Sequence, residues 1–433
     1  MDETTQRPFK WFPVMILVSV FQLITSCSVI FKNGETDIKL LGVFAAFVLF
    51  EWIYMLAASI LFSLRHLELE IIGFFLSGIG LTICASVDTG YALKQAVSIF
   101  IGVIVYVVML AVLRRSDIVS ALRTPVAIFA VALLVINIVL AETTNGTLNW
   151  IEIKGISIQP SEIVKVAFVF VGAASLDKLQ RTRSITKYII FAVVCVGFLF
   201  LMRDFGTALI FFFSFLIIAF MRSGDIRTIA LVCAAAVLGA VMVIYFKSTV
   251  AARFATYRHI WDDMYGKGMQ QTRTMIYSAS GGLFGLGIGN GKLKSTFAST
   301  TDLVFGMVCE EWGLIIALTI MLTFVFLVLF AVKTAKNTRS AFYAIASCAA
   351  AGMLLFQMSL NVFGVTDLLP FTGVTLPFIS RGGTSMLCSW GLLAFIKSAD
   401  IYTYPRLSQT ILPDHPLYRE DIPISKKRRR EAR

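Results

Sequence analysis

The fold of this chain is decided by the stretch TLPFISRGGTSML, which runs from Thr375 to Leu387. It places Pro377, Arg381 and the Gly382–Gly383 pair inside an otherwise apolar run of membrane type. At the depth of a bilayer, backbone breakers and a fixed charge are tolerated only where they face protein or a water-filled cavity. The stretch therefore predicts a membrane-embedded segment that lines an interior site.

The composition supports this interpretation for the whole chain. Of the 433 residues, 58% are hydrophobic and 15% are charged, and the mean hydropathy is +0.82. A soluble domain is closer to half apolar and about a quarter charged. The chain is therefore expected to be an all-α polytopic membrane protein.

The net charge of +12 does not indicate a nucleic-acid-binding protein, because the basic residues fall in short loops between apolar runs. The seven Cys occur singly inside apolar runs, without a CxxC pair, so they are interpreted as small apolar residues. The three His are scattered, which argues against a His-built metal site. The first ten residues are too short and too charged for a signal peptide, so the first apolar run is expected to be a retained helix.

Runs of about 20 apolar residues, the length that crosses a bilayer, recur along the chain. They predict twelve spans, of which the seventh and eighth are separated only by RDFG and could form a broken pair around a buried loop. The predicted spans are 11–32, 38–63, 70–87, 95–113, 122–142, 162–177, 186–202, 205–221, 227–246, 303–332, 341–363 and 374–397.

The loop charges predict the orientation of these spans. Loops that follow even-numbered spans are rich in Lys and Arg, whereas short loops on the other side, such as 33–37, are poor in them. This asymmetry places both termini in the cytoplasm and the long 247–301 loop outside, together with a second outer loop at 142–162. The basic loop residues are Arg65, Arg114, Arg115, Arg123, Lys178, Arg181, Arg183, Lys187, Arg222, Arg227, Lys333, Lys336 and Arg339, followed by Lys426–Arg430 in the tail.

Four further polar or glycine-rich motifs accompany the opening stretch. They are QPSEIVK (159–165), RDFGTAL (203–209), SGGLFGLGIGNG (280–291) and TTDLVFGMVCEEWG (300–313). In this order, between about residues 71 and 396, the five motifs resemble the SEDS family of FtsW and RodA proteins, which polymerise peptidoglycan glycan strands from lipid II. The resemblance implies a ten-helix core at 69–400, preceded by two added helices within 1–68. The tail 401–433 is interpreted as a disordered segment facing anionic lipid, or as a docking site for cytoplasmic partners.

Asp302 is the candidate catalytic residue. It lies where the long outer loop meets the tenth span, and a partly desolvated carboxylate there could act as a general base. The spacing alone favours a helix cap built from Thr300, Thr301 and Asp302. The resemblance favours catalysis, because Asp302 matches the family's catalytic Asp, although Thr300 stands where the family often has His.

Glu310 and Glu311 match the family's EELG motif and are candidate substrate-binding residues. The alternative is a buried polar pair that holds neighbouring helices together, with at least one carboxylate paired or protonated. Glu162 and Lys165 are three residues apart, so they share a helix face. They form either a local ion pair or a site in which Lys165 binds a pyrophosphate, as the match to QPSExxK implies.

The long outer loop carries basic residues that form either a solvated face or a funnel for an anionic lipid-linked diphosphate. Arg253 ranks first because it matches a family Arg, whereas Arg273 stands near a family Gln. The others are Arg258, Lys267, Lys292 and Lys294.

Three motif positions call for other interpretations. The glycine-rich 280–291 motif follows no strand, so its glycines indicate close backbone approach rather than nucleotide binding. Asp204 is expected to cap the next span. Arg381 replaces a common family Tyr and, as a buried cation, is expected to need a carboxylate or phosphate partner.

The resemblance implies an inverting glycosyltransferase of the bacterial cytoplasmic membrane, acting in elongation, division or sporulation. Asp302 would deprotonate the acceptor GlcNAc hydroxyl, which attacks C1 of MurNAc on the growing strand. The polyprenyl diphosphate would leave, helped by Lys165, Arg253 and a divalent cation, Mg²⁺ or Mn²⁺, if one is used. A class B penicillin-binding protein is the expected partner. The alternatives are a lipid II flippase and a non-catalytic scaffold for a transpeptidase.

Overall fold

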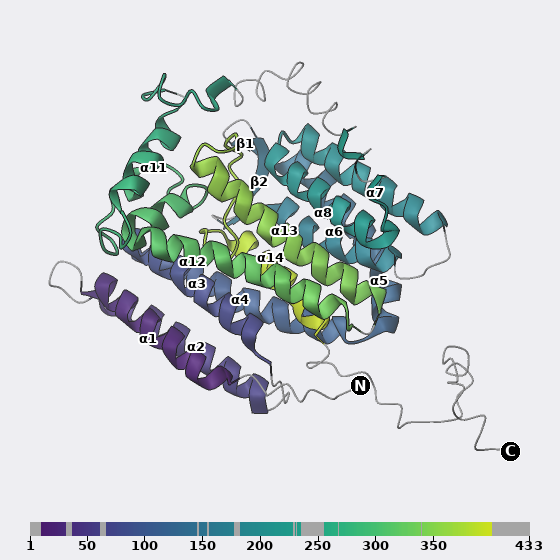
Figure 1. Cartoon of the computed structure of the whole chain (residues 1–433), viewed down its shortest axis with the longest axis horizontal. Helices are drawn as coiled ribbons and strands as arrows, with labels where there is room; N and C mark the ends of the chain where they lie inside the picture. The colour runs from purple at the N-terminus through teal and green to yellow at the C-terminus, as the bar shows by residue number, and fades with distance from the viewer. Residues whose placement is uncertain are drawn as a thin grey trace.

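The computed structural model describes residues 10–31, 37–60, 66–144, 147–153, 156–176, 182–227, 230, 232–234, 255–266, 268–338 and 340–400. They fold into a bundle of helices, with α11 at the end of the bundle where α12 begins (Figure 1). The helices are α1 (Trp11–Ile30), α2 (Ile38–Ile60), α3 (Glu68–Val87), α4 (Thr89–Leu113), α5 (Ser116–Leu140), α6 (Pro160–Leu176), α7 (Thr182–Leu201), α8 (Phe205–Ser223), α11 (Met269–Ser280), α12 (Val304–Ala335), α13 (Ala341–Val365) and α14 (Gly383–Ser398).

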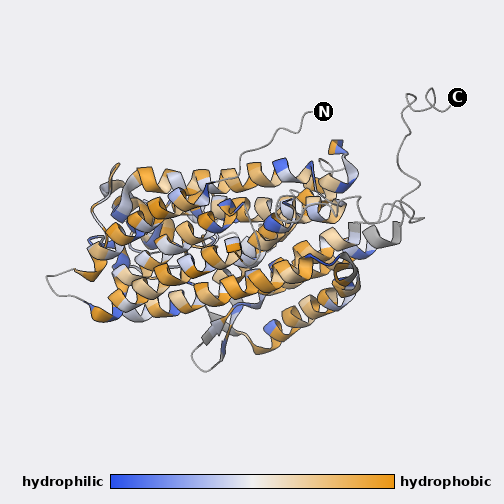
Figure 2. Ribbon diagram, turned by 90° about the horizontal axis from the view of Figure 1, so that it is seen from below, coloured by the Kyte–Doolittle hydropathy of each residue, from blue (hydrophilic) through white to orange (hydrophobic). Residues whose placement is uncertain are grey.

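The expectation of an all-α polytopic membrane protein is confirmed. Eight helices in the described part of the chain are long and apolar enough to cross a membrane, and α6, α7 and α14 offer shorter apolar stretches. Apolar residues cover most of the length of these helices (Figure 2). Many of them point outward, such as Leu17 and Val139, which a bilayer would cover. The predicted ninth span, 227–246, falls largely outside the described residues.

The second predicted outer loop contains a small sheet that the helix-based prediction lacked. Its strands are β1 (Glu142–Thr144), β2 (Thr147–Ile153) and β3 (Ile156–Ile158), paired antiparallel in the order β1-β2-β3. The sheet connects α5 to α6, and β2 packs against both helices. It thereby leads the chain directly into the QPSEIVK motif.

The predicted start of the twelfth span is wrong. Helix α14 begins at Gly383, not at residue 374, and residues 366–382 form a non-helical segment that we term the re-entrant segment. Gly373 and Phe378 have φ values of +71° and +64°, and Pro377 has no N–H to donate. Residues 374–380 are nonetheless buried, so the breakers of this motif keep irregular backbone inside the protein, as its composition predicts.

The predicted tenth span is also interrupted. Helix α12 contains Gly313 at φ +83° and ψ 173°, which divides it into a short buried helix before Gly313 and a long helix after it. The junction of the seventh and eighth spans is a tight turn in which Arg203 has φ +61°. Asp204 caps α8, because its carboxylate accepts a hydrogen bond from the Thr207 N–H at 3.1 Å, which confirms the predicted capping role.

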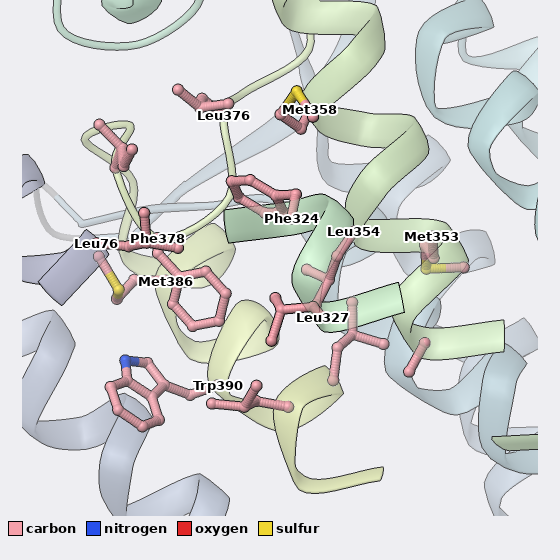
Figure 3. Close-up of a cluster of buried hydrophobic side chains, with 14 of the residues drawn as sticks. Leu76, Phe324, Leu327, Met353, Leu354, Met358, Leu376, Phe378, Met386 and Trp390 are labelled. Atoms are coloured by element: carbon pink, nitrogen blue, oxygen red, sulfur yellow. The ribbon is translucent and has the colours of Figure 1, made fainter. Parts of the chain in front are cut away.

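The core is organised around α14, which packs against α4, α13 and α6. Trp390 is fully buried, and its ring lies 5.0 Å from the Phe74 ring and 5.8 Å from the Phe378 ring (Figure 3). A Cβ at Gly73 would lie 2.7 Å from the Trp390 ring, so the indole needs a glycine on α3 to occupy this position. The re-entrant segment is therefore held against the centre of the bundle through Phe378.

A buried ion pair joins α3 to α14. The Lys397 ammonium on α14 lies 3.2 Å from the Glu70 carboxylate on α3, and both side chains are almost fully buried. Tyr106 donates a hydrogen bond to Glu70 at 2.8 Å, and Lys397 also donates to the His66 carbonyl. Removal of one partner would leave a buried charge uncompensated, so this cluster fixes α14 against α3 and α4.

Candidate functional site

The re-entrant segment is attached to the residues just before α12. The Ser380 hydroxyl accepts a hydrogen bond from the Leu376 N–H at 2.7 Å and donates one to the Thr301 carbonyl at 2.6 Å. The Arg381 N–H donates to the Thr300 carbonyl at 2.7 Å. Two motifs that are far apart in the sequence, at 300–302 and 375–387, therefore form one structure.

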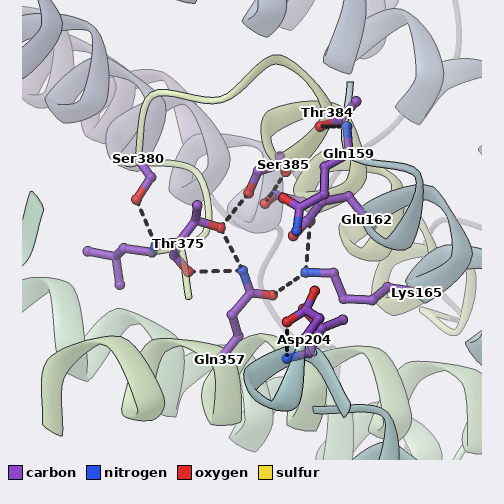
Figure 4. A network of polar contacts seen from close by, with 12 residues as sticks. Gln159, Glu162, Lys165, Asp204, Gln357, Thr375, Ser380, Thr384 and Ser385 are labelled. Carbon is purple, nitrogen blue, oxygen red and sulfur yellow. Dashed lines mark hydrogen bonds and ion pairs between the residues drawn. The ribbon is translucent and has the colours of Figure 1, made fainter. Parts of the chain in front are cut away.

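The other side of the re-entrant segment is attached to α6. The Lys165 ammonium lies 2.7 Å from the Glu162 carboxylate and donates a hydrogen bond of 2.7 Å to Gln357 on α13. Gln357 in turn donates to the carbonyl and hydroxyl of Thr375, at 2.9 and 3.2 Å (Figure 4). The Thr375 hydroxyl is 2.9 Å from that of Ser385 at the start of α14. A continuous polar chain therefore runs from α6 to α14.

Glu162 and Lys165 share a helix face and form the ion pair that their spacing predicts. Lys165 is only 1% exposed and is bonded to two protein acceptors, so a ligand in solvent does not reach it in this conformation. The structure gives the pair a positioning role toward Gln357. Direct binding of a diphosphate by Lys165, and with it the substrate-binding assignment of Glu162, stays a prediction.

Asp302 stands at the centre of the arrangement. Asn361, one helical turn after Gln357 on α13, donates hydrogen bonds to the Asp302 carbonyl at 2.8 Å and to the Val374 carbonyl at 2.7 Å. A Cβ at Gly373 would lie 3.3 Å from an Asp302 carboxylate oxygen, so this carboxylate faces the glycine turn of the re-entrant segment. Asp302 is half-buried, whereas its neighbours Leu303 and Thr300 are buried.

The structure places the N-cap of α12 at Leu303 rather than at Asp302, and the Leu303 side chain makes no capping hydrogen bond. Asp302 stays a predicted catalytic residue. Its backbone is fixed by Asn361 while its side chain remains partly accessible, which is the arrangement that a general base requires.

Arg381 differs from its predicted environment. It is half-buried rather than buried, and its guanidinium lies 3.8 Å from the centre of the Tyr91 ring on α4, a cation–π contact. Within the described residues no carboxylate lies within 4.0 Å of it. Since its N–H bonds Thr300, this accessible cation is tied to the segment that carries Asp302.

Glu310 and Glu311 belong to a different set of contacts. The Glu310 carboxylate accepts hydrogen bonds from the N–H groups of Lys292 and Leu293 at 2.7 and 2.9 Å, and the Glu311 carboxylate accepts one from Gly289 at 2.9 Å. These contacts hold the glycine-rich motif, a loop rather than a neighbouring helix, against α12. A substrate-binding role for either carboxylate stays a prediction.

The glycines of this motif permit close backbone approach, as their number predicts. A Cβ at Gly281 would lie 2.1 Å from the Cys309 carbonyl oxygen, and one at Gly285 would lie 2.3 Å from that of Glu311. Backbone hydrogen bonds run between the two segments, for example from Leu286 to Glu310 at 2.9 Å. The motif is a loop wrapped around the broken part of α12.

The structure describes only some of the basic residues that were predicted to form a funnel. Arg253 and Lys267 lie outside the described residues. Arg258, Arg273 and Lys292 are exposed, whereas Lys294 donates a hydrogen bond to the Gly289 carbonyl at 2.8 Å. The exposed members are compatible with either a solvated face or a funnel.

Sequence reasoning missed Gln357 and Asn361, which join the two halves of the site. It considered only ionisable residues within spans, although buried amides at membrane depth are also costly unless they are bonded. The signal was present, because the two polar residues are four apart in the apolar run LLFQMSLNVF and so lie on one face of α13.

No cluster of three or more His, Cys, Asp or Glu that could hold a metal ion occurs among the residues that the structure describes. Dependence on Mg²⁺ or Mn²⁺ stays a prediction.

Known proteins resemble this chain in structure and in sequence. A chain of a solved peptidoglycan synthase complex, described as coordinating polymerization and crosslinking, has a TM-score of 0.65 at 20% identity. It covers 79% of this chain and 99% of its own length, which shows a shared fold.

Two curated relatives are similar in sequence. The peptidoglycan glycosyltransferase RodA of Mycobacterium bovis is 28% identical over 268 residues, which cover 58% of this chain and 57% of that protein. This chain thus spans little more than half the length of the mycobacterial relative. The probable peptidoglycan glycosyltransferase FtsW of Buchnera aphidicola is 28% identical over 308 residues, which cover 66% of this chain and 77% of that protein.

The family model described as Cell cycle protein, for FtsW, RodA and SpoVE, matches residues 71–404. The match begins within α3 and includes Lys165, Asp302 and the re-entrant segment. It covers well over half of the chain, which therefore belongs to the FtsW/RodA/SpoVE family, the SEDS proteins.

Proposed function

We propose that this protein is a peptidoglycan glycosyltransferase that polymerises lipid II into glycan strands at the outer face of the bacterial cytoplasmic membrane. The observation that carries the proposal is the position of Asp302, whose backbone carbonyl is bonded by Asn361 and whose half-buried carboxylate faces Gly373. The two curated relatives named as peptidoglycan glycosyltransferases support the same activity.

In the proposed reaction the Asp302 carboxylate accepts the proton of the acceptor sugar hydroxyl. The hydroxyl oxygen forms a bond to C1 of the donor sugar while the bond from C1 to the diphosphate oxygen breaks. The diphosphate leaves with that electron pair, and the configuration at C1 inverts. A positioned general base contributes about 10²–10⁴-fold to such a step.

The leaving diphosphate requires positive charge nearby. Arg381 is suited to this, because it is accessible, carries no ion-paired carboxylate among the described residues, and is bonded through its N–H to Thr300. A guanidinium can bind a phosphate through two parallel hydrogen bonds. Arg253 is the second proposed contact, from its family match alone.

A lipid II flippase is the rival function. The buried polar chain from Lys165 to Ser385 would suit a transporter, since intramembrane polar residues also mark transport pathways. The position of Asp302 favours chemistry, because it precedes α12 at the end of the bundle that carries α11 (Figure 1).

We also propose a class B penicillin-binding protein as the partner, since the related solved chain comes from a complex that combines polymerization with crosslinking. Purified protein incubated with lipid II is expected to form glycan strands, resolved as a ladder on a gel, and to form more when the partner is co-purified. A stable complex with the partner that yields no strands would contradict the proposed activity.

The proposed topology predicts which residues are accessible from outside. Ser295 lies on the surface of the segment before α12, and Lys336 is exposed just past the other end of that helix. In intact spheroplasts, an impermeant thiol reagent is expected to label S295C and not K336C, with labelling of the wild-type protein as background. The opposite pattern would place Asp302 on the cytoplasmic side and exclude external synthesis.

A further inference from the structure

A groove lies between α2 and α4, away from the Asp302 site. Its volume is about 1130 Å³, slightly above the range of about 300–1,000 Å³ that is typical of small-molecule sites. Helix α2 precedes the family match, so half of the groove is built by an element outside the matched region. The lining residues are Asp37, Ile38, Lys39, Gly42, Val43, Ala46, Phe47, Phe50, Thr89, Gly90, Leu93, Ala96, Val97 and Phe100.

The two helices contact each other at both ends of the groove. At one end the Thr89 hydroxyl donates a hydrogen bond of 2.9 Å to Asp37, and at the other end the Phe50 and Phe100 rings lie 5.0 Å apart. From Thr89 to Phe100 a helix rises about 16 Å at about 1.5 Å per residue. That is close to half of the roughly 30 Å hydrocarbon core, the depth of one leaflet.

The walls between these ends are apolar and open to the side. Small residues, among them Gly42 and Ala46, make room on α2, and an added Cβ at Gly42 would meet nothing within 4 Å. Leu93 and Val97 on α4 are 55% and 50% exposed, although both line the groove. In a membrane, such an open apolar wall is covered by lipid hydrocarbon or by another helix.

The polar end of the groove carries the exposed Lys39 side chain. The Asp37 carboxylate beside it accepts hydrogen bonds from the Leu40 N–H, the Thr89 hydroxyl and the Lys39 N–H, and these bonds lower its pKa. The exposed Lys39 ammonium has no carboxylate within 4.0 Å among the described residues. A lipid chain that enters the groove would therefore place its headgroup beside the exposed Lys39 ammonium, whose charge also contributes to the lowered pKa of Asp37.

We propose that this groove binds one anionic phospholipid of the leaflet on the Lys39 side, with an acyl chain between α2 and α4 and the phosphate against Lys39. The length of one leaflet, the apolar walls and the cation at the mouth fit this occupant. A transmembrane helix of another protein could also cover the apolar walls, but an apolar helix would offer no anionic group to the Lys39 ammonium. Binding would fasten the N-terminal hairpin α1–α2 to the family core through α4.

The test uses the purified full-length protein in detergent, titrated with dioleoyl phosphatidylglycerol or dioleoyl phosphatidylcholine and followed by native mass spectrometry. The wild type is expected to retain one phosphatidylglycerol in preference to phosphatidylcholine. Lys39→Gln is expected to weaken phosphatidylglycerol binding about five-fold, the effect of one basic side chain near anionic lipid, and to leave phosphatidylcholine binding unchanged.

Gly42→Leu fills the groove and is expected to abolish the retained phosphatidylglycerol. Gly197→Leu is the matched control, because Gly197 is also a helical glycine with nothing within 4 Å of an added Cβ, and it lies on α7. Equal lipid retention by the two leucine variants would overturn the proposal. So would equal retention of both lipids by the wild type, or a co-purified protein helix that crosslinks to the groove and excludes lipid.

Discussion

Asp302→Asn is expected to reduce glycan-strand synthesis by about 10²–10⁴-fold, the contribution of a positioned general base. Asparagine keeps the shape of the side chain but cannot accept the proton of the acceptor hydroxyl. The Asn361 hydrogen bond to the backbone carbonyl of residue 302 does not depend on the side chain, so the local structure should persist. Lipid II binding should also persist, because the base contacts a hydroxyl and not the diphosphate.

The measurement is the initial rate of strand formation by partner-bound protein, with lipid II binding determined on the same sample. Asp262→Asn is the matched control, because Asp262 is an exposed carboxylate of the segment before α12 whose only described ion pair is with His259. The control is expected to retain the wild-type rate. If folded, partner-bound Asp302→Asn protein also polymerises at near the wild-type rate, Asp302 is not the base.

Gly313→Ala is expected to cause a large loss of stability, together with loss of activity. Gly313 has φ +83°, a conformation that costs a non-glycine residue about 1–3 kcal/mol. An added Cβ would also lie 2.4 Å from both the Gly285 nitrogen and the Leu283 carbonyl oxygen, which are backbone atoms that cannot move independently. The glycine-rich loop would therefore be displaced from α12, and the segment that carries Asp302 would lose its support.

Thermal unfolding of the purified protein measures this effect. Gly197→Ala serves as the control, because the same substitution at an unobstructed helical glycine meets no atom within 4 Å. The control should unfold at or above the wild-type temperature, whereas Gly313→Ala should unfold well below it. Equal unfolding temperatures for the two variants would mean that the broken helix does not depend on Gly313.

Much of the fold could be predicted, because apolar runs of membrane length determine helices almost independently of tertiary structure. The errors occur where the chain departs from that rule. The apolar residues around Pro377 predict a helix from residue 374, yet hydrogen bonds from Leu376 to Ser380 and from Ser380 to Thr301 hold that backbone in an irregular form. Hydropathy does not reveal contacts between segments about 80 residues apart.

The sequence predicted several residues of the candidate site, but it did not predict the hydrogen bonds that join them. Motifs identified Asp302 and Lys165, but only the structure shows that Asn361 joins Asp302 to residue 374 and that Gln357 joins Lys165 to residue 375. The roles of Glu310 and Glu311 were left open for the same reason. Their partners are backbone N–H groups of the glycine-rich loop, which no side-chain pattern can specify.

Under the proposed function, this protein joins lipid II units rather than moving them across the membrane. The most direct measurement places the wild-type complex in vesicles that contain lipid II, and follows strand formation and transbilayer movement of lipid II in the same vesicles. The expected result is strands made by the wild type and lost in Asp302→Asn, with no movement above that of protein-free vesicles. Movement of lipid II by the wild type without any strands would contradict the claim and establish the transporter instead.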